Sequence, residues 1–521
     1  MQIVRIGDGR TEPCSAETVG AKAANLARMA ALGLPVPPAF VLPVELCAAV
    51  VRGDQDARKK VSDGLRDGIA FLEQATGRAF NDRRRPLLVS VRSGAARSMP
   101  GMLDTVLDVG CNAAAVHGLV RMTGNPRFAW DCRRRFLESY GEVVLGIDAG
   151  QFTARRDALE EGGALDSEAV EHLAGEFQQL IEEADEKLPD DPMEQLGAAA
   201  QAVYRSWMSG RACTYRRLQH LDDLQGTAVT VQAMVFGNRG SNSGAGVAFS
   251  RDPSTGTARP VIDILFESQG EDVVSGTRTP DNEAALDACA PAVAGQLRNT
   301  LAQLEREFAD VQDVEFTIED EKLWILQTRS AKRTPLAAVK FAVDFVKEGL
   351  ITPAQASHRL HDIDLESLAY RRFAGAGEPA ARGIAASAGV AVGRVAFDSE
   401  SAQRLAARGE PVILVRPDTS TADVAGFAVA AGIVTAAGGR TAHAALVARQ
   451  MGKPCVVGCA ALSIDSGARN AHLGDSQIKE GDWISVDGEA GAIYPGQRDI
   501  VIERPQAELA EVERWRADAA A

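Results

Sequence analysis

The spacing of apolar residues divides the chain into stretches of different secondary structure. Residues 1–110 have a mixed pattern, which predicts a helix over residues 21–32 and an apolar strand over residues 87–91. Between residues 126 and 217, apolar residues recur three and four positions apart, as at Leu173, Phe177 and Leu180. This period is that of amphipathic helices, so a helical subdomain is expected after the mixed segment.

Strands return from residue 227 onward. The pattern predicts them over residues 228–236, 261–266, 314–318 and 323–327, with a hairpin across residues 319–322. Helices are predicted over residues 335–348 and 353–360. Residues 371–383 carry little apolar pattern, and we expect an interdomain connector there.

A second compact domain is predicted over residues 384–500, where short strands alternate with Gly and Ala turns. It contains one well-defined helix over residues 442–451, which Gly452 closes and Pro454 follows. The last stretch, residues 506–521, is charged, Ala-rich and helix-like.

Length and composition indicate a multidomain globular protein. A chain of 521 residues is too long for one ordinary domain and suggests three or four structural units. No apolar run approaches the length that spans a bilayer, and the N-terminus lacks the order of a secretory signal. We therefore expect a cytoplasmic protein that does not enter a membrane.

Charge and cysteine content exclude further classes. With 56 Lys and Arg against 71 Asp and Glu, the net charge of −15 opposes binding to a nucleic-acid backbone. The eight cysteines are scattered without CxxC pairs, which favours reduced thiols over a disulfide or zinc framework. Because the net charge is negative, any phosphate site must be a local feature of the surface and not part of a broad basic one.

The first stretch that could carry chemistry is Gly-Gly-Arg-Thr-Ala-His-Ala-Ala at residues 438–445. A glycine turn delivers His443 into the first turn of a helix, with Thr441 as the candidate N-cap and small neighbours that leave the imidazole accessible. A neutral imidazole is a competent nucleophile toward phosphorus, and a helix N-terminus favours the anionic group that it acquires. The stretch suits a phosphohistidine, although an isolated histidine of this kind would more often be structural.

The second stretch, residues 89–105, predicts a strand that delivers Arg92 to a loop rich in small residues. Backbone amides of such a loop could close over phosphates while the guanidinium supplies charge. No G-x-x-x-x-G-K-[ST] pattern occurs, which disfavours a P-loop ATPase. Lys22, on the helix that follows Gly20, could add a phosphate contact, although a single surface lysine is more often only solvated.

The third stretch combines residues 313–316 with residues 326–329. On a strand, Asp313 and Glu315 point to the same face, where they can share a hard cation such as Mg²⁺ while Gln327 and Arg329 approach from the partner strand. The alternative is an exposed acidic strand face, which is the more common meaning of two alternating acids in an acidic chain.

Together these stretches closely resemble pyruvate phosphate dikinase. The first group of motifs reads GAKAANL (20–26), SVRSGAARSMPGMLDTVL (90–107), QDVEFTIED (312–320), LQTR (326–329) and GGRTAHAALVAR (438–449). The resemblance continues through TAVTVQAMVFGN (227–238), SGAGVAFSRDPSTG (243–256) and QGEDVVSGTRTP (269–280). It runs over almost the whole chain and identifies it as a member of that family.

The resemblance implies a multidomain α/β (α+β) fold. Residues 1–340 would form an ATP-grasp nucleotide-binding unit, with the helical subdomain at about residues 111–217. Residues 341–383 would be a helical connector and hinge, and residues 384–505 a swivelling β/β/α phosphohistidine domain that the hinge carries between sites. Residues 506–521 would begin the linker to the family's large C-terminal barrel, which we expect to be missing.

The resemblance also implies the roles of individual residues. His443 would be the phosphoryl carrier, assisted by Arg92, and Thr441 a regulatory phosphorylation site. The residues implied to bind ATP, the substrate, and Mg²⁺ are Lys22, Arg92, Gly101, Asp313, Glu315, Gln327 and Arg329, of which Asp313, Glu315 and Gln327 would ligate the metal.

In the family, ATP pyrophosphorylates the histidine with release of AMP, and inorganic phosphate then removes one phosphoryl group as pyrophosphate. The expected activity is this half-reaction. The alternatives are a natural short subunit that passes phosphate to a separate phosphoenolpyruvate/pyruvate barrel or other acceptor protein, and an inactive nucleotide-binding regulatory module. Because the family dimerises largely through the barrel, a monomer is expected.

Three positions depart from the family. Arg440 and Ala442 stand where the family usually has Met and Ser, so a cation is gained and a hydroxyl is lost beside the histidine. Glu267 stands where Asn is common, which adds negative charge near the expected nucleotide pocket.

Overall fold

The computed structural model describes residues 3–9, 14–97, 99, 103–160, 166–275, 278–366, 368–375, 377–419, 423–440, 442–465 and 467–520. The chain divides into two compact units. The first holds residues 1–241 and 324–328, and the second holds residues 242–323 and 329–521. Within the described ranges, no helix is both long and apolar enough to cross a membrane.

The first unit is built on a five-stranded sheet in the order β1-β2-β5-β3-β4, whose neighbours pair antiparallel. The strands are β1 (Val4–Ile6), β2 (Ala39–Leu42), β3 (Val89–Gly94), β4 (Thr105–Val109) and β5 (Ala228–Ala233). Every residue of β5 is buried because β2 and β3 flank it and helices pack on the sheet. Two of its buried residues, Thr230 and Gln232, are polar, so the central position of the strand and not an apolar run accounts for its burial.

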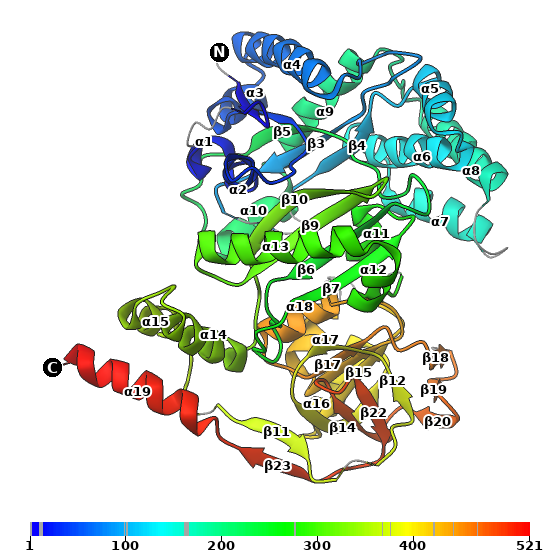
Figure 1. Cartoon of the computed structure of the whole chain (residues 1–521). Helices are drawn as coiled ribbons and strands as arrows, with labels where there is room; N and C mark the ends of the chain where they lie inside the picture. Colours follow the sequence, from blue (N-terminus) through cyan, green and yellow to red (C-terminus); the bar gives the residue numbers. More distant parts are fainter. Residues whose placement is uncertain are drawn as a thin grey trace. The chain divides into compact units, whose positions relative to one another are not determined.

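Helices fill the rest of the first unit. They are α1 (Ala16–Val19), α2 (Ala21–Ala31), α3 (Cys47–Val51), α4 (Gln55–Thr76), α5 (Ala113–Thr123), α6 (Pro126–Val143), α7 (Ala149–Glu160), α8 (Ser167–Glu183), α9 (Pro192–Ser206) and α10 (Gly210–Leu218), with a short 3₁₀ turn at Val44–Leu46. α6 packs against both α5 and α8 (Figure 1). The predicted helical run is confirmed, and its apolar stripe is buried, with Phe177 edge-on to Phe152 at a centroid distance of 5.0 Å.

Side-chain caps set where these helices begin. An Asn, Asp or Ser side chain accepts a hydrogen bond from a backbone N–H of the first turn in α5, α6, α8, α9 and α10. The capping residues are Asn112, Asn125, Asp166, Asp191 and Ser209. Pro126 and Pro192 follow their caps directly, where the missing N–H costs nothing.

The second unit begins with another five-stranded sheet, in the order β10-β9-β6-β7-β8. Its strands are β6 (Gly244–Phe249), β7 (Val261–Phe266), β8 (Asp281–Asn282), β9 (Gln312–Glu319) and β10 (Lys322–Ser330), and its helices are α11 (Gly270–Ser275), α12 (Glu283–Cys289) and α13 (Pro291–Phe308). The predicted β9–β10 hairpin is confirmed. Its two turn residues, Asp320 and Glu321, have φ of 48° and 63°, as a two-residue turn with both centres left-handed requires.

An eight-stranded sheet follows, in the order β12-β22-β21-β14-β15-β16-β17-β13. Its strands are β12 (Ala381–Arg382), β13 (Ile384–Ser387), β14 (Val390–Ala396), β15 (Val412–Arg416), β16 (Gly432–Thr435), β17 (Cys455–Val457), β21 (Trp483–Asp487) and β22 (Ala492–Pro495). The four strands from β14 to β17 run parallel. Successive residues of β15 join different cores, Val412 and Leu414 on one face and Ile413 and Val415 on the other.

Each face of this sheet is covered differently. The helices α16 (Ser399–Ala406), α17 (Val424–Val429) and α18 (His443–Gln450) pack on the face of Val412 and Leu414. The opposite face is covered by a three-stranded sheet of β18 (Leu462–Asp465), β19 (Asn470–Leu473) and β20 (Ser476–Lys479).

The predicted connector is more structured than its composition suggests. Within it lie β12 and β11 (Tyr370–Phe373), and β11 pairs antiparallel with β23 (Ile500–Glu503). Backbone pairing with a distant segment forms these strands, and apolar periodicity carries no information about such pairing. The helices α14 (Pro335–Lys347), α15 (Pro353–Arg359) and α19 (Gln506–Ala520) share a core, to which α19 contributes Leu509, Val512 and Trp515.

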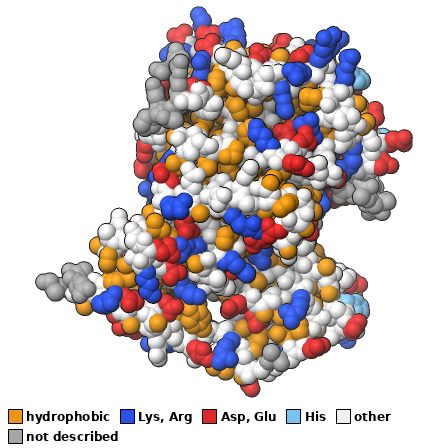
Figure 2. Space-filling model, in the orientation of Figure 1, with side chains coloured by type: hydrophobic (Ala, Val, Ile, Leu, Met, Phe, Trp, Pro, Cys, Tyr) orange, Lys and Arg blue, Asp and Glu red, His pale blue; other side chains and the backbone are white. Residues whose placement is uncertain are grey.

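The mixed α/β multidomain fold class is therefore confirmed. On the face drawn in Figure 2, acidic and basic side chains are interspersed rather than gathered by sign.

Two helix glycines give a test of how tightly the first unit is packed. A Cβ at Gly68 in α4 would lie 2.4 Å from the ring of Phe40, whereas one at Gly175 in α8 would meet nothing within 4 Å. Gly68→Ala should therefore lower the free energy of unfolding by about 1–3 kcal/mol through overpacking. Gly175→Ala should raise it by roughly 0.5–1 kcal/mol, the helix preference for Ala over Gly. Thermal midpoints that shift in the same direction for both variants would contradict this packing.

Candidate active site

A small cavity in the first unit brings together residues that are far apart in the sequence. Its volume is about 20 Å³, and it is lined by Lys22, Ala23, Leu26, Arg92, Ser93, Thr230, Gln232, Leu326 and Gln327. Three of the predicted site residues, Lys22, Arg92 and Gln327, thus share one site. The present volume holds about one water molecule, so a larger ligand requires the cavity to widen.

Two polar atoms in this cavity point to a polar ligand. Arg92 Nε and Thr230 Oγ1 are buried and have no hydrogen-bond partner among the described residues. A buried donor without a partner costs about 1–3 kcal/mol, so such atoms are retained where a ligand or water completes them.

The backbone explains why these side chains meet. Gly20 has a φ of 82°, and a Cβ there would lie 2.2 Å from the carbonyl oxygen of Gly94. The first N–H of α2, on Ala21, donates to the carbonyl of Ala95 at 2.9 Å. Glycine at position 20 therefore allows the start of α2, with Lys22, to lie directly against the end of β3.

The position of Arg92 corrects one sequence expectation. It lies within β3, opposite Thr230 of β5 and Thr105 of β4, and not on the loop beyond the strand. Pairing with β4 as far as Arg92 and with β5 as far as Gly94 extends β3 past the apolar residues from which its end was predicted. Gly101, a predicted phosphate contact, lies outside the described residues.

A second cluster lies on β9 and β10 in the second unit. Arg329 Nε donates to Asp313 Oδ2 at 2.8 Å, and its Nη2 lies 3.9 Å from Glu315 Oε1. Both carboxylates thus face the same guanidinium, as the strand alternation predicted. Asp313 is only 1% exposed, so the exposed acidic face considered as an alternative is wrong for this residue.

The electrostatics of Asp313 suit an additional cation. Burial raises the pKa of this carboxyl above its ordinary value, and Arg329 offsets the effect only in part. Its Oδ1 is buried without a hydrogen-bond partner among the residues described. No cluster of three or more His, Cys, Asp or Glu with metal-binding geometry occurs in the described ranges. Two carboxylates nevertheless fit Mg²⁺, which is commonly held by one or two carboxylates together with substrate phosphates and water.

The third predicted stretch surrounds His443, the first residue of α18. Ala442 occupies the N-cap position and provides no side-chain hydrogen bond, and Thr441, the predicted N-cap, lies outside the described residues. The imidazole is also less accessible than its small neighbours suggested. It is half-buried against Phe427, with ring centroids 5.7 Å apart, and its Nε2 is buried without a partner in the described structure.

This environment favours the neutral form of His443. Burial lowers the pKa of the imidazole below its ordinary value, and Asp423 opposes the shift only in part. A neutral ring whose Nε2 lone pair accepts no hydrogen bond retains its nucleophilic capacity. Nε2 must become exposed before it can react.

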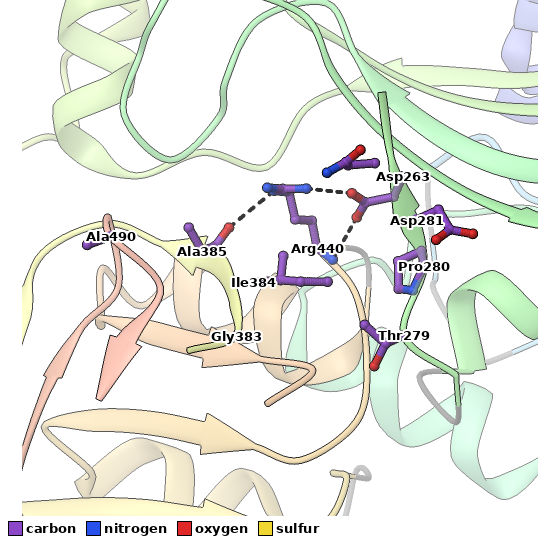
Figure 3. Close-up of a pocket in the computed structure, with 10 residues that line it drawn as sticks. Asp263, Thr279, Pro280, Asp281, Gly383, Ile384, Ala385, Arg440 and Ala490 are labelled. Carbon is purple, nitrogen blue, oxygen red and sulfur yellow. Dashed lines mark hydrogen bonds and ion pairs between the residues drawn. The ribbon is translucent and has the colours of Figure 1, made fainter. Parts of the chain in front are cut away.

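The loop before His443 is held by a carboxylate that sequence reasoning missed. Asp263, on β7, accepts from the backbone N–H of Arg440 at 2.9 Å and from its Nη1 at 2.6 Å (Figure 3). Arg440 Nε also donates to the carbonyl of Ala385 at 3.2 Å. These residues border a cavity of about 440 Å³ in the second unit. The signal in the sequence was the single acid in the otherwise apolar strand of residues 261–266.

Arg449 is a second residue that the sequence analysis did not single out, and its buried side chain holds the same loop before His443. It is 1% exposed on α18 and donates to the backbone carbonyls of Arg440 and Ala445. Burial lowers the pKa of this guanidinium to about 10, and its cationic face lies 5.1 Å from the ring centre of Phe249.

Glu267, which stands where the family commonly has Asn, lies at a turn with an unusual backbone conformation. Its side chain is exposed and its φ is 51°, a left-handed conformation in which Asn is enriched and most other side chains are disfavoured. The Asn that is common in the family suits this turn better than Glu does.

Comparison with known protein families agrees with this arrangement. Residues 57–288 and 286–349 match the pyruvate phosphate dikinase AMP/ATP-binding domain, and residues 408–491 match the mobile domain of PEP-utilising enzymes. Pyruvate, phosphate dikinase of Clostridium symbiosum is 43% identical over 490 residues, which cover 92% of this chain and 56% of that protein. The Rhizobium meliloti (strain 1021) enzyme is 41% identical over 547 residues, which cover 99% and 60%.

The chain thus combines a nucleotide-binding domain with a mobile phosphotransfer domain. It belongs to the pyruvate phosphate dikinase family. It spans a little over half the length of these curated relatives.

Thr230 allows a direct test of the cavity in the first unit. Thr230→Val keeps the shape of the side chain and removes a hydroxyl that has no partner among the described residues. Fold stability should be maintained, and affinity for ATP should fall about three- to tenfold with the loss of one hydrogen bond. Isothermal titration calorimetry measures this affinity. The control is Ser387→Ala in the second unit, which removes another buried hydroxyl that has no partner in the described part of the chain. Equal affinities in wild type and Thr230→Val would exclude the hydroxyl as a ligand contact.

Proposed function

We propose that this chain uses ATP to phosphorylate its own His443. The observation that supports this most directly is the place of that residue, a half-buried imidazole at the start of α18 inside the region that matches a mobile domain, whose Nε2 has no partner among the described residues. The nucleotide would bind in the first unit between Lys22 and Arg92, where the unsatisfied polar atoms lie.

In the proposed reaction, Nε2 of His443 attacks the β-phosphorus of ATP. The N–P bond forms as the bond between the β-phosphorus and the oxygen bridging it to the α-phosphate breaks, and AMP leaves. Inorganic phosphate then attacks the outer phosphoryl group of the pyrophosphorylated histidine and leaves as pyrophosphate, so that one phosphoryl group remains on Nε2. Lys22 and Arg92 would hold the phosphates by charge, and Arg92 would neutralise charge that develops during transfer.

Asp313 and Glu315, with Gln327, are the proposed ligands of Mg²⁺. The cation would neutralise phosphate charge and orient the polyphosphate. The neighbouring Arg329 binds Asp313 Oδ2 and so leaves Oδ1 as the oxygen with unused capacity.

The proposed final acceptor of the phosphoryl group follows from the names of the relatives. The relatives are named for pyruvate and phosphate, and we propose that the phosphoryl group on His443 is passed to pyruvate, either within a longer chain or on a separate acceptor protein. An inactive nucleotide-binding module is the competing proposal. It would bind ATP and form no covalent phosphohistidine.

His443→Ala should abolish covalent phosphorylation and leave ATP binding nearly unchanged, because the nucleophile is lost and the nucleotide cavity is not altered. The measurements are transfer of label from β-³²P-ATP and intact-protein mass after exposure to Mg-ATP with and without phosphate. His472→Ala, an exposed histidine on β19 of the same domain, is the matched control and should label normally. Comparable labelling of the His443 variant would refute the carrier assignment, and no labelling of wild type would favour the binding module.

Asp313→Asn and Glu315→Gln should raise the Mg²⁺ concentration for half-maximal autophosphorylation by on the order of tenfold or more, since each removes one anionic ligand. The maximal extent of labelling at saturating Mg²⁺ should be largely retained. Asp310→Asn provides the control, because Asp310 pairs with Arg333 at 2.6 Å in the same unit and has no proposed metal role. If all three variants keep the wild-type Mg²⁺ dependence, the metal assignment is wrong.

A further inference from the structure

The helix that touches the His443 ring begins with a buried acid. Phe427, which packs on the imidazole, lies four residues after Asp423 and therefore one helical turn further along α17. Asp423 is only 5% exposed and occupies the N-cap position without capping the helix through its side chain.

Two side chains hold this carboxylate in place. Asp423 Oδ1 accepts from Ser399 Oγ at 3.3 Å and forms an ion pair with Arg416 Nε, also at 3.3 Å. Arg416 is anchored in turn, because its Nη1 donates to the carbonyl of Phe397 at 2.9 Å. Gly426 allows the close approach of α17 to α16, since a Cβ there would lie 2.8 Å from Ser399 Oγ.

The other charged groups around the carrier helix are engaged elsewhere. Lys453 donates to the carbonyls of Phe427, Ala428 and Ala430 at 2.6 Å each, at the end of α17. Arg449 donates to backbone carbonyls, and Arg440 binds Asp263. Asp423 is the charged group whose field raises the pKa of His443 against the lowering effect of burial.

We propose that Asp423, held by Arg416 one helical turn before the Phe427 that packs on His443, is a positioning residue whose charge stabilises the cation that the imidazole becomes during phosphoryl transfer. The proposal rests on the proposed role of His443 as the carrier. When Nε2 forms its bond to phosphorus, the neutral ring, protonated on Nδ1, becomes cationic. A fixed carboxylate nearby stabilises that cation without taking its proton.

Arg416 limits the strength of this effect. It partly neutralises Asp423, so the carboxylate supports the developing imidazolium without holding the resting ring in its protonated, unreactive form. The two side chains should therefore act on His443 in opposite directions.

The decisive measurement is the pKa of His443 itself, followed by NMR titration of labelled imidazoles and assigned with His443→Ala. Asp423→Asn should lower this pKa by on the order of half a unit, because it removes the anionic neighbour. Arg416→Gln should raise it, because the carboxylate is left uncompensated. Asp423→Glu should restore a value near that of wild type. Glu410→Gln, which removes a carboxylate paired with Arg394 at 2.6 Å in the same domain, should leave it unchanged.

The pH profile of autophosphorylation gives the second readout. The rate requires the neutral ring, so its acid limb should move to lower pH in Asp423→Asn and to higher pH in Arg416→Gln, with a lower plateau rate in Asp423→Asn. A His443 pKa that does not respond to Asp423→Asn, or shifts of the same sign in both variants, would overturn the proposal. Because the titration needs no phosphorylation, it separates failure of this proposal from failure of the carrier assignment.

Discussion

The second unit depends on the pairing of buried carboxylates with arginines. Removing a carboxylate from water costs several kcal/mol unless a cation or hydrogen-bond donors compensate it. Three acids near the proposed chemistry are buried, and each is met by an arginine from a different element: Asp313 by Arg329, Asp263 by Arg440 and Asp423 by Arg416. These pairs fix, in turn, the β9–β10 hairpin, the loop before His443 and the start of α17. Removing one partner of such a pair should lower the free energy of unfolding more than removing one partner of a surface ion pair, because the remaining charge stays buried.

The same pairs leave specific atoms available for chemistry. Arg329 satisfies one oxygen of Asp313 and leaves Oδ1 unpaired among the described residues, which is the capacity a shared cation would use. Arg92 Nε and Thr230 Oγ1 are likewise unsatisfied in the first unit. The proposed nucleotide and metal contacts therefore include atoms with unmet hydrogen-bonding capacity, although such atoms also occur elsewhere, as at Ser387. Phosphorylation of His443 would also require a conformational change, since its buried Nε2 has to become exposed before it reacts.

Local patterns predicted much of the fold for identifiable reasons. The apolar stripe at Leu173, Phe177 and Leu180 specifies an amphipathic helix because its period is that of the helix. Residues 261–266 were predicted with the bounds that β7 has, because a short apolar run between turn residues has few other conformations. The connector was less well predicted, since β11 exists through pairing with β23, more than a hundred residues away. The end of β3 was missed for the same reason, as neighbouring strands and not its own apolar residues extend it to Gly94.

By itself, the sequence determined the family, through the resemblance of its motifs, the residue types of the proposed phosphate, metal and carrier motifs, and the shared face of Asp313 and Glu315. The shared face follows from the period of the strand, which alone decides which side chains neighbour each other. Only the tertiary structure decided that Lys22, Arg92 and Gln327 border one cavity, that Asp263 receives Arg440, and that Asp423 lies at the helix touching His443. Burial and the charge of distant neighbours set the protonation and accessibility of a side chain, and both arise from contacts that a linear pattern does not encode.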